Sequence, residues 1–520
     1  MALNGSQIIA RALKRHGVDN FFYIMGGPMM AAESETMEQG IRGVDVRHEQ
    51  AAALMAHAYA RLQNRPGICM AASGPGVTNL VTGIAHAWAD CTPVIALGGS
   101  SPYGMSGQGG FQEIDQVTMM SPCTKWSERV YDPARIPEYI NKAFQTAMSG
   151  KPGPVYLDFP GDVLYRNVEE DTIVWPEPWD PAKRSRPQAS NADVESVISM
   201  LEAAERPVIV SGSGIQWSGA EGAMQDFVEA AGIPFYTTPQ SRGAIPEDHK
   251  YCYLTARSAA FREADLIFVL GTRMNYVIGN AAPPRFNADA KIVRVEIDPI
   301  ELESSPRKLD LGIVGDARAV LEQLTAAAKG RLSPSRYQSW QERLGGSNAS
   351  KVEEQEKILS NSSEPIHPLR LCKEIRDFLD RDAILVVDGQ EILNFGRQSI
   401  PTFAPRHRIN SGCFGTMGVG LPMGLGAKVA SPDKQVLVLH GDGSFGMNGM
   451  EMDTAARHNI AVTCVISMNG GWTADPEKKK PGRDLGYKRY DQMAEALGAH
   501  GEYVEKPGDI RAALERPKEA

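Results

Sequence analysis

The sequence has few of the features that mark secreted, membrane or nucleic-acid-binding proteins. No uncharged stretch approaches the roughly 20 apolar residues of a transmembrane helix, and the polar start MALNGSQ does not resemble a signal peptide. Seven scattered cysteines without a Cys-x-x-Cys pair argue against a zinc site or a disulfide framework and favour a reducing compartment. A net charge of −9 without a long Lys/Arg run gives no indication of a basic surface that would bind nucleic acid. We therefore predict a cytoplasmic protein that binds neither nucleic acid nor membranes.

Short apolar runs alternate with segments of helical period along nearly the whole chain, which is the pattern of parallel α/β sheets. At 520 residues the chain is too long for one core. We predict the α/β class with three parallel-sheet domains, at residues 1–178, 190–330 and 365–520, and linkers at 176–191 and 329–365. The expected strands are 20–24, 67–71, 93–97, 153–160, 207–212, 266–271, 291–298, 383–389, 435–441 and 461–468. The last domain should receive one more strand, so we expect the sequence to be shortened at its C-terminus.

Two polar turns follow neighbouring strands of the last domain. Gly441-Asp442-Gly443-Ser444 ends one apolar run, and Asn469-Gly470-Gly471 ends the next. A helix at about 446–458 would return the chain, so both turns should lie at one edge of a parallel sheet. Carboxylate and amide oxygens suit Mg²⁺, which often shares its coordination with phosphate. Glycines allow the backbone to approach that phosphate.

The stretch GDGSFGMNGMEMDTAARHNIAVTCVISMNGG resembles the thiamine diphosphate-binding motif. The resemblance implies that Asp442, Asn469 and the Gly471 carbonyl hold Mg²⁺, which holds the diphosphate of the cofactor. Gly443 and Ser444 would also contact the diphosphate. Gly389-Gln390 resembles a further contact to this group.

Two other segments resemble parts of the same superfamily. VRHEQAAALMAHAYAR, residues 46–61, implies that Glu49 exchanges a proton with a ring nitrogen of the cofactor, at a helix start where desolvation would favour its protonated form. GCFGTMGVGLPMGLGA, residues 412–427, implies that the Gly415 carbonyl accepts from the cofactor amino group while Met417 supports its bend. Because the family builds each site from two subunits, we expect at least a homodimer, and a tetramer is common in this group.

The reaction has to be inferred from residues outside the cofactor motif. GQGGFQEIDQV, residues 107–117, resembles the active-site loop of acetolactate synthases and 2-hydroxyacyl-CoA lyases, with Phe111 and Gln112 facing the reacting carbon. Oxalyl-CoA decarboxylases tend to carry a Tyr-Glu pair there. Residues 256–298 look like the lyase and decarboxylase branch, in which this domain can bind an adenine nucleotide. ADP, FAD and an empty domain stay open alternatives.

Four residues of the middle domain carry that nucleotide hypothesis. Arg257, Arg273 and Asn275 match the branch. Arg273 would bind a phosphate of the nucleotide, and Asp298 would bind its ribose. The alternative is a structural salt bridge in a plain α/β domain. The basic residues at 478–489 either form a solvated flank or meet the phosphates of coenzyme A.

The resemblance therefore implies a thiamine diphosphate-dependent lyase that cleaves a 2-hydroxyacyl-CoA to formyl-CoA and an aldehyde or ketone. Gln112 would position the 2-hydroxyl. The alternatives are an acetolactate synthase-like enzyme acting on 2-oxo acids and an oxalyl-CoA decarboxylase. A non-catalytic binding or regulatory relative is disfavoured because Glu49, Asp442 and Asn469 are all present.

Overall fold

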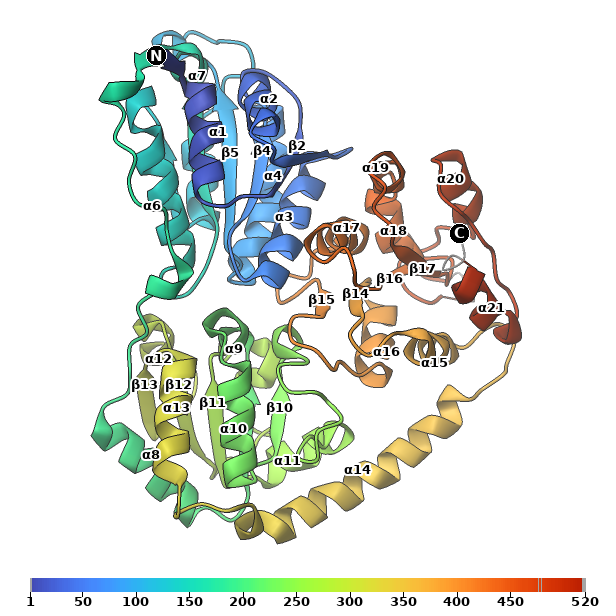
Figure 1. The fold of residues 1–520 in the computed structure, drawn as a ribbon. Coiled ribbons are helices and arrows are strands. Elements are labelled where there is room, and N and C mark those ends of the chain that lie inside the picture. The colour runs from blue at the N-terminus through green and yellow to red at the C-terminus, as the bar shows by residue number, and fades with distance from the viewer. Residues whose placement is uncertain (1, 476, 478, 517–520) are drawn as a thin grey trace. The chain divides into compact units, whose positions relative to one another are not determined.

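The structure is a computed structural model that describes residues 2–475, 477 and 479–516. It has three mainly parallel sheets, which confirms the predicted α/β class (Figure 1). They are distributed over two compact units. Unit 1 contains Met1–Arg184, Ile384–Leu393 and Ile409–Tyr503, and unit 2 contains Ser185–Ala383, Asn394–Arg408 and Val504–Ala520.

The N-terminal sheet of unit 1 has six parallel strands in the order β3-β2-β4-β5-β7-β6, with helices on both faces (Figure 1). Its strands are β2 (Asn20–Ile24), β3 (Arg42–Asp45), β4 (Gly67–Ala71), β5 (Val94–Ser100), β6 (Trp126–Arg129) and β7 (Val155–Pro160). Its helices are α1 (Gly5–Arg15), α2 (Met30–Glu38), α3 (Glu49–Gln63), α4 (Pro75–Ala89), α5 (Gln116–Met120), α6 (Ile136–Met148) and α7 (Gly161–Tyr165). The short strands β1 (Ala2–Asn4) and β8 (Asn167–Glu169) pair antiparallel. The central strands are buried on both faces, which explains their continuous apolar runs.

The second sheet of unit 1 has the order β15-β14-β16-β17. Its strands are β14 (Ile384–Asp388), β15 (Arg408–Asn410), β16 (Val436–Gly441) and β17 (Thr463–Ser467), and its helices are α16 (Glu391–Ser399), α17 (Gly420–Ala430), α18 (Asp442–Asn448), α19 (Glu451–Arg457) and α20 (Tyr490–Ala496). Helix α17 packs against α3, where Leu54 and Ala58 join Met423 and Ala427 in one buried cluster. Two predicted domains therefore share a hydrophobic core, which explains why they form one compact unit.

Unit 2 is built on a five-stranded parallel sheet with the order β10-β9-β11-β12-β13. Its strands are β9 (Pro207–Ser211), β10 (Phe235–Thr237), β11 (Leu266–Leu270), β12 (Lys291–Glu296) and β13 (Leu311–Val314). Its helices are α8 (Asn191–Ala203), α9 (Ser213–Ser218), α10 (Glu221–Ala231), α11 (Arg257–Glu263), α12 (Pro299–Glu303), α13 (Ala317–Ala328), α14 (Gln338–Leu359), α15 (Pro368–Phe378) and α21 (Ile510–Glu515). One hydrophobic core, formed by buried residues between Ala189 and Leu344, surrounds this sheet.

Every predicted strand is present, with ends that differ by at most a few residues. The single helix predicted at 446–458 is wrong, because α18 and α19 are separate helices on either side of Gly449 and Met450. The segment at 329–365, predicted as a partly helical linker, contains the 22-residue helix α14. Among the described residues, none of the helices combines the length and apolar character that crossing a membrane requires.

Candidate active site

The two polar turns predicted to carry a metal meet at the ends of β16 and β17. These strands are parallel neighbours, and Gly441 pairs with Ser467 at their last register position. The Asp442 carboxylate accepts the N–H of Gly470 at 2.8 Å through Oδ2. Asn469 Oδ1 accepts the N–H of Gly471 at 3.0 Å. Parallel pairing thus brings residues 27 positions apart in the sequence into one hydrogen-bonded cluster.

The donor chemistry of this cluster fits a hard divalent cation and a diphosphate. A carboxylate, an amide oxygen and backbone carbonyls are the ligands that Mg²⁺ prefers. Burial raises the pKa of Asp442, and a bound cation would oppose this by stabilising the ionised form. A methyl group built on Gly441 would have no atom within 4 Å, so the turn is open at this point.

Glu391 belongs to the same cluster, although the sequence did not single it out. It opens α16, and its Oε2 accepts a 2.7 Å hydrogen bond from Asn469 Nδ2. This contact orients the amide so that its oxygen and nitrogen have distinct partners, as residues behind metal ligands commonly do. The signal in the sequence was the position of Glu391 just after β14, which is another strand of the same sheet.

The remaining residues predicted to contact the diphosphate have mixed outcomes. Gly389 has a φ of 109°, and a Cβ there would lie 3.2 Å from the Gly441 nitrogen, so this turn packs closely on the Asp442 turn. Gln390 is exposed. The Ser444 hydroxyl donates to the Gly441 carbonyl at 3.0 Å and lies 3.1 Å from His440 Nδ1. Contact between Ser444 and phosphate stays a prediction that would require the hydroxyl to turn.

Gly415 and Met417 lie in the loop Ser411–Gly418, between β15 and α17. Gly415 has a φ of 73°, is exposed, and would have no atom within 4 Å of an added Cβ. Met417 is half-buried. Their roles in bending the cofactor stay predictions, and the open surroundings of Gly415 leave room for a ligand.

Glu49 occupies the first position of α3, as predicted. His48 caps the helix through its side chain, which accepts from Gln50 N. Glu49 is half-buried, and its carboxylate accepts a 2.9 Å hydrogen bond from Asn79 Nδ2 on α4. Just before the helix, the Arg47 N–H donates to the buried Glu451 carboxylate. Burial raises the pKa of Glu451 to about 7.

The predicted substrate loop has an unusual backbone at Gln112. This residue has a φ of 58°, which is rare for a side chain of its size. Its Oε1 accepts from the Ser73 hydroxyl at 2.8 Å, and Ser73 also contacts the Gly27 carbonyl. Phe111 is 87% exposed. Since strained residues concentrate at functional sites, the geometry supports Gln112 more strongly than Phe111 in a binding role.

Unit 2, which includes the part of α16 from Asn394 onward, concentrates positive charge around Arg257, the first residue of α11. Burial, followed by Arg285, Arg397 and Arg242, lowers the pKa of Arg257 to about 10. Arg242 is balanced by a buried bidentate contact to Glu247. Among the residues that the structure describes, Arg257, Arg285 and Arg397 make no ion pair to a carboxylate. We call these three residues the arginine cluster.

The other predicted nucleotide residues lie at the carboxyl ends of β11 and β12. Arg273 follows β11. Asn275 caps the next 3₁₀ helix by accepting from Val277 N, and Asp298 caps α12 by accepting from Ile300 N. The last two side chains therefore have structural hydrogen bonds, and nucleotide binding at these positions stays a prediction.

The segment after Asn469 folds back on itself, because Trp472 N donates to Arg483 O and Leu485 N donates to Gly470 O. Several of its charges are paired locally. Lys479 pairs with Glu477, and Arg489 pairs with Asp491. Lys478 lies outside the described residues. These pairs weaken the hypothesis that residues 478–489 bind coenzyme A phosphates.

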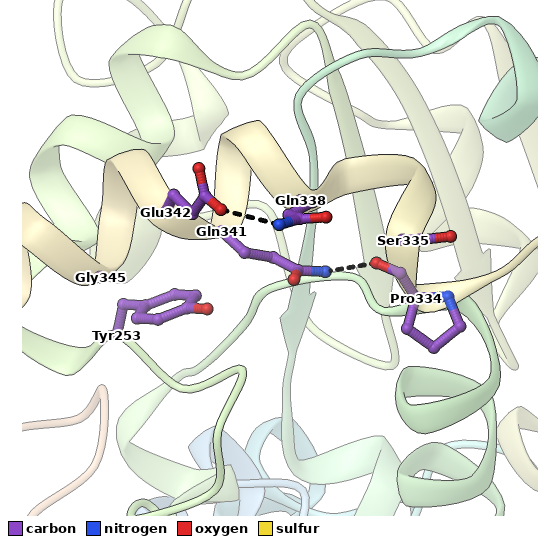
Figure 2. A pocket seen from close by; sticks show the side chains of 7 residues that line it. All are labelled: Tyr253, Pro334, Ser335, Gln338, Gln341, Glu342 and Gly345. Atoms are coloured by element: carbon purple, nitrogen blue, oxygen red, sulfur yellow. Dashed lines mark hydrogen bonds between the residues drawn. The ribbon is translucent and has the colours of Figure 1, made fainter.

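A cavity of about 500 Å³ lies on unit 2, well away in sequence from the predicted cofactor residues. It is lined by Tyr253, Pro334, Ser335, Gln338, Gln341, Glu342 and Gly345. Figure 2 shows that both glutamine side chains bond within the lining, with Gln338 donating to Glu342 and Gln341 to the Pro334 carbonyl. Because these donors already have partners, we assign the cavity no ligand.

Comparison with known proteins identifies the family. Residues 3–119 match the N-terminal TPP-binding domain of thiamine pyrophosphate enzymes, residues 194–324 the central domain and residues 393–519 the C-terminal TPP-binding domain. The chain therefore belongs to the thiamine pyrophosphate enzyme family, and the predicted cofactor class is confirmed.

Relatives of this chain carry three different activities in their names. A 2-hydroxyacyl-CoA lyase of Arabidopsis thaliana is 33% identical over 99% of this chain and 93% of its own length. A probable acetolactate synthase of Mycobacterium bovis is 32% identical over 99% of this chain and 93% of its own. An oxalyl-CoA decarboxylase of Escherichia coli K12 is 32% identical over 98% of this chain and 92% of its own length. These identities are too similar to choose one reaction.

Proposed function

We propose that the chain is a thiamine diphosphate- and Mg²⁺-dependent lyase that cleaves a 2-hydroxyacyl-CoA to formyl-CoA and an aldehyde or ketone. The arginine cluster is the single observation that carries the choice of substrate class. Three like charges stay close together only at a cost, which a polyanionic ligand would remove. Coenzyme A carries several phosphate charges, whereas a 2-oxo acid carries one carboxylate.

The chain's own residues divide the proposed work. Asp442, Asn469 and the Gly471 carbonyl hold Mg²⁺ and, through it, the cofactor diphosphate. Bound thiamine diphosphate supplies a nucleophilic carbon that allows cleavage of the bond beside a carbonyl. Glu49 holds a proton at the cofactor ring nitrogen, and Gln112 orients the 2-hydroxyl of the substrate.

We further propose a homodimer or homotetramer in the cytoplasm, with ADP as the candidate occupant of the middle domain, held by Arg273 and Asp298 rather than by the arginine cluster. An acetolactate synthase-like reaction is the second candidate, because the loop at 107–117 also resembles those enzymes and the M. bovis relative carries that name. Oxalyl-CoA decarboxylase is the third, supported by the E. coli relative.

The test is to incubate the protein with Mg²⁺, thiamine diphosphate and either a 2-hydroxyacyl-CoA or pyruvate. Formation of formyl-CoA together with an aldehyde or ketone supports the lyase. Turnover of pyruvate without carbon–carbon cleavage of the 2-hydroxyacyl-CoA contradicts it and favours the synthase. Oxalyl-CoA as a third substrate separates the decarboxylase.

A further inference from the structure

The loop Ser411–Gly418 contains three glycines in left-handed conformations. Gly412, Gly415 and Gly418 have φ values of 54°, 73° and 81°. Glycine loses more backbone freedom on ordering than other residues, so a loop of this composition needs external contacts to hold one conformation. A cofactor-binding segment must be fixed within about 0.5 Å.

Those contacts come from the C-terminal end of α4. Cys413 Sγ donates to the Ala89 carbonyl at 3.1 Å, and the Cys413 N–H donates to Asp90 Oδ1 at 3.4 Å. His86 Nδ1 lies 3.0 Å from the Thr416 hydroxyl. A Cβ at Gly412 would come within 2.0 Å of Asp90 Oδ1, so only glycine allows this approach.

The Asp90 carboxylate faces His86 inside this buried group. Burial would raise the pKa of Asp90, but the contact with His86 and the charge of Arg61 outweigh burial and lower this pKa to about 2. His86 Nε2 lies 3.4 Å from Asp90 Oδ2, although among the described residues it has no hydrogen-bond partner of regular geometry. A proton on Nε2 would face this carboxylate and would leave Nδ1 as the acceptor for the Thr416 hydroxyl. Both side chains are at most 2% exposed.

His57 completes the buried group. Burial lowers its pKa to about 3, so it is neutral, and its ring lies 5.0 Å from that of His86. Donor atoms of His57, His86 and Asp90 lie within 4.8 Å of one another, a spacing compatible with a metal. The buried Arg61 already supplies positive charge beside Asp90. A divalent ion would leave uncompensated charge in the core, so we assign the group another role.

We propose that His86 and Asp90 are positioning residues, which hold Thr416 and thereby set the Gly415 carbonyl and the Met417 side chain for the aminopyrimidine end of the cofactor. This inference rests on the cofactor part of the proposed function and not on its substrate. The contacts lie on both sides of Gly415, at Cys413 and at Thr416. Losing them would leave the diphosphate end, held by Asp442 and Asn469, unchanged.

The test compares Thr416→Val, which keeps the side-chain shape but removes the hydroxyl, with Thr416→Ser, which keeps the hydroxyl. Titrations use intact protein with Mg²⁺ and either thiamine diphosphate or inorganic pyrophosphate, without acyl-CoA. Thr416→Val should weaken thiamine diphosphate binding by about tenfold, the worth of one hydrogen bond. Pyrophosphate binding should not change, and Thr416→Ser should bind both like the wild type.

Equal loss of both ligands in Thr416→Val, or no loss, would overturn the proposal. A second variant, Asp90→Asn, keeps an acceptor for the Cys413 N–H but removes the charge that fixes His86. If Asp90 acts through His86 and Thr416, the variant that combines Asp90→Asn with Thr416→Val should bind thiamine diphosphate no more weakly than Thr416→Val alone. Additive losses would contradict this order of action. Since no substrate is present, either result is independent of the lyase assay.

Discussion

The cluster around Asp442 and the arginine cluster around Arg257 both gather polar groups, but they differ in how those groups are satisfied. In the first, Asp442 and Asn469 accept backbone N–H groups of the turn at 469–471, and Asn469 also donates to Glu391. In the second, the strongest charged neighbours of Arg257 are other arginines. The first region is organised by its own residues, whereas in the second no carboxylate among the described residues pairs with Arg257, Arg285 or Arg397, which is why we propose an anionic ligand there.

This difference explains why the cofactor was easier to infer than the substrate. A self-contained metal and diphosphate site requires particular residues at fixed distances after two strands, so it leaves a motif in the sequence. The arginine cluster, with residues on α11, on α16 and after a 3₁₀ helix, leaves no such spacing. The following predictions test the two regions, beginning with the largest expected effect.

Glu49→Gln should lower kcat by roughly 10²–10⁴-fold, the usual contribution of a positioned acid or base. Cofactor binding should be retained, because Glu49 does not belong to the diphosphate cluster. Steady-state turnover combined with a cofactor titration measures both quantities. Asn79→Ala, which removes the hydrogen bond to Glu49, is the matched control and should lower turnover much less. Full activity of Glu49→Gln would refute the assignment.

Asp442→Asn should weaken Mg²⁺-dependent binding of thiamine diphosphate by at least about 100-fold, because it removes the anionic metal ligand. Glu391→Gln keeps an oxygen that can accept from Asn469 but removes the charge of the carboxylate, and it should cost about 10–100-fold. Calorimetric titration at several Mg²⁺ concentrations gives both values. If Asp442→Asn binds as tightly as Glu391→Gln, the metal is not held where we place it.

Arg257→Gln should raise KM for the acyl-CoA by about tenfold while kcat changes little, because it removes a charged contact to a phosphate. If the enzyme also turns over pyruvate, KM for pyruvate should not change, because pyruvate carries no phosphate. Arg318→Gln, an exposed arginine paired with Glu322 in the same unit, is the control. A parallel increase for both substrates would show that the variant damages the fold.

Glu33 offers a test of stability rather than of activity, because it is a buried carboxyl group to which we assign no ligand. It is 1% exposed, and neither carboxyl oxygen has a hydrogen-bond partner. Burial raises the pKa of Glu33 from 4.5 to about 8, and the nearby Gly26 N–H offsets only part of this. The neutral form is therefore favoured in the folded protein.

Between pH 4.5 and 8 the folded state binds the proton more tightly than the unfolded state, so stability must fall as pH rises. Glu33→Gln removes this dependence, worth on the order of 4 kcal/mol. The melting temperature of the variant relative to the wild type should increase by several degrees from pH 5 to pH 8 and then level off. A constant difference across this range would contradict the assignment.

Much of the fold could be predicted because buried parallel strands are continuous apolar runs, as in residues 266–270. The break between α18 and α19 was missed because Gly449 and Met450 do not disturb the helical spacing of apolar residues. The shared core of α3 and α17 was missed for another reason. Contacts such as Met55 against Gly426 join residues more than 350 positions apart, which no local pattern records.

The candidate site divides in the same way. Asp442, Asn469 and Glu49 could be predicted, since each follows a strand or opens a helix within a recognisable motif. Local patterns could not predict Glu391, Glu451 or the His86–Asp90 pair. Each of these contacts a partner distant in the sequence, respectively Asn469, Arg47 and Thr416.

The most direct measurement of the central claim is the ratio of kcat/KM for a 2-hydroxyacyl-CoA to kcat/KM for pyruvate, using protein saturated with Mg²⁺ and thiamine diphosphate. We expect a ratio well above one, with formyl-CoA as a product, and a fall of about tenfold in this ratio in Arg257→Gln. A ratio below one that does not respond to Arg257→Gln would contradict it.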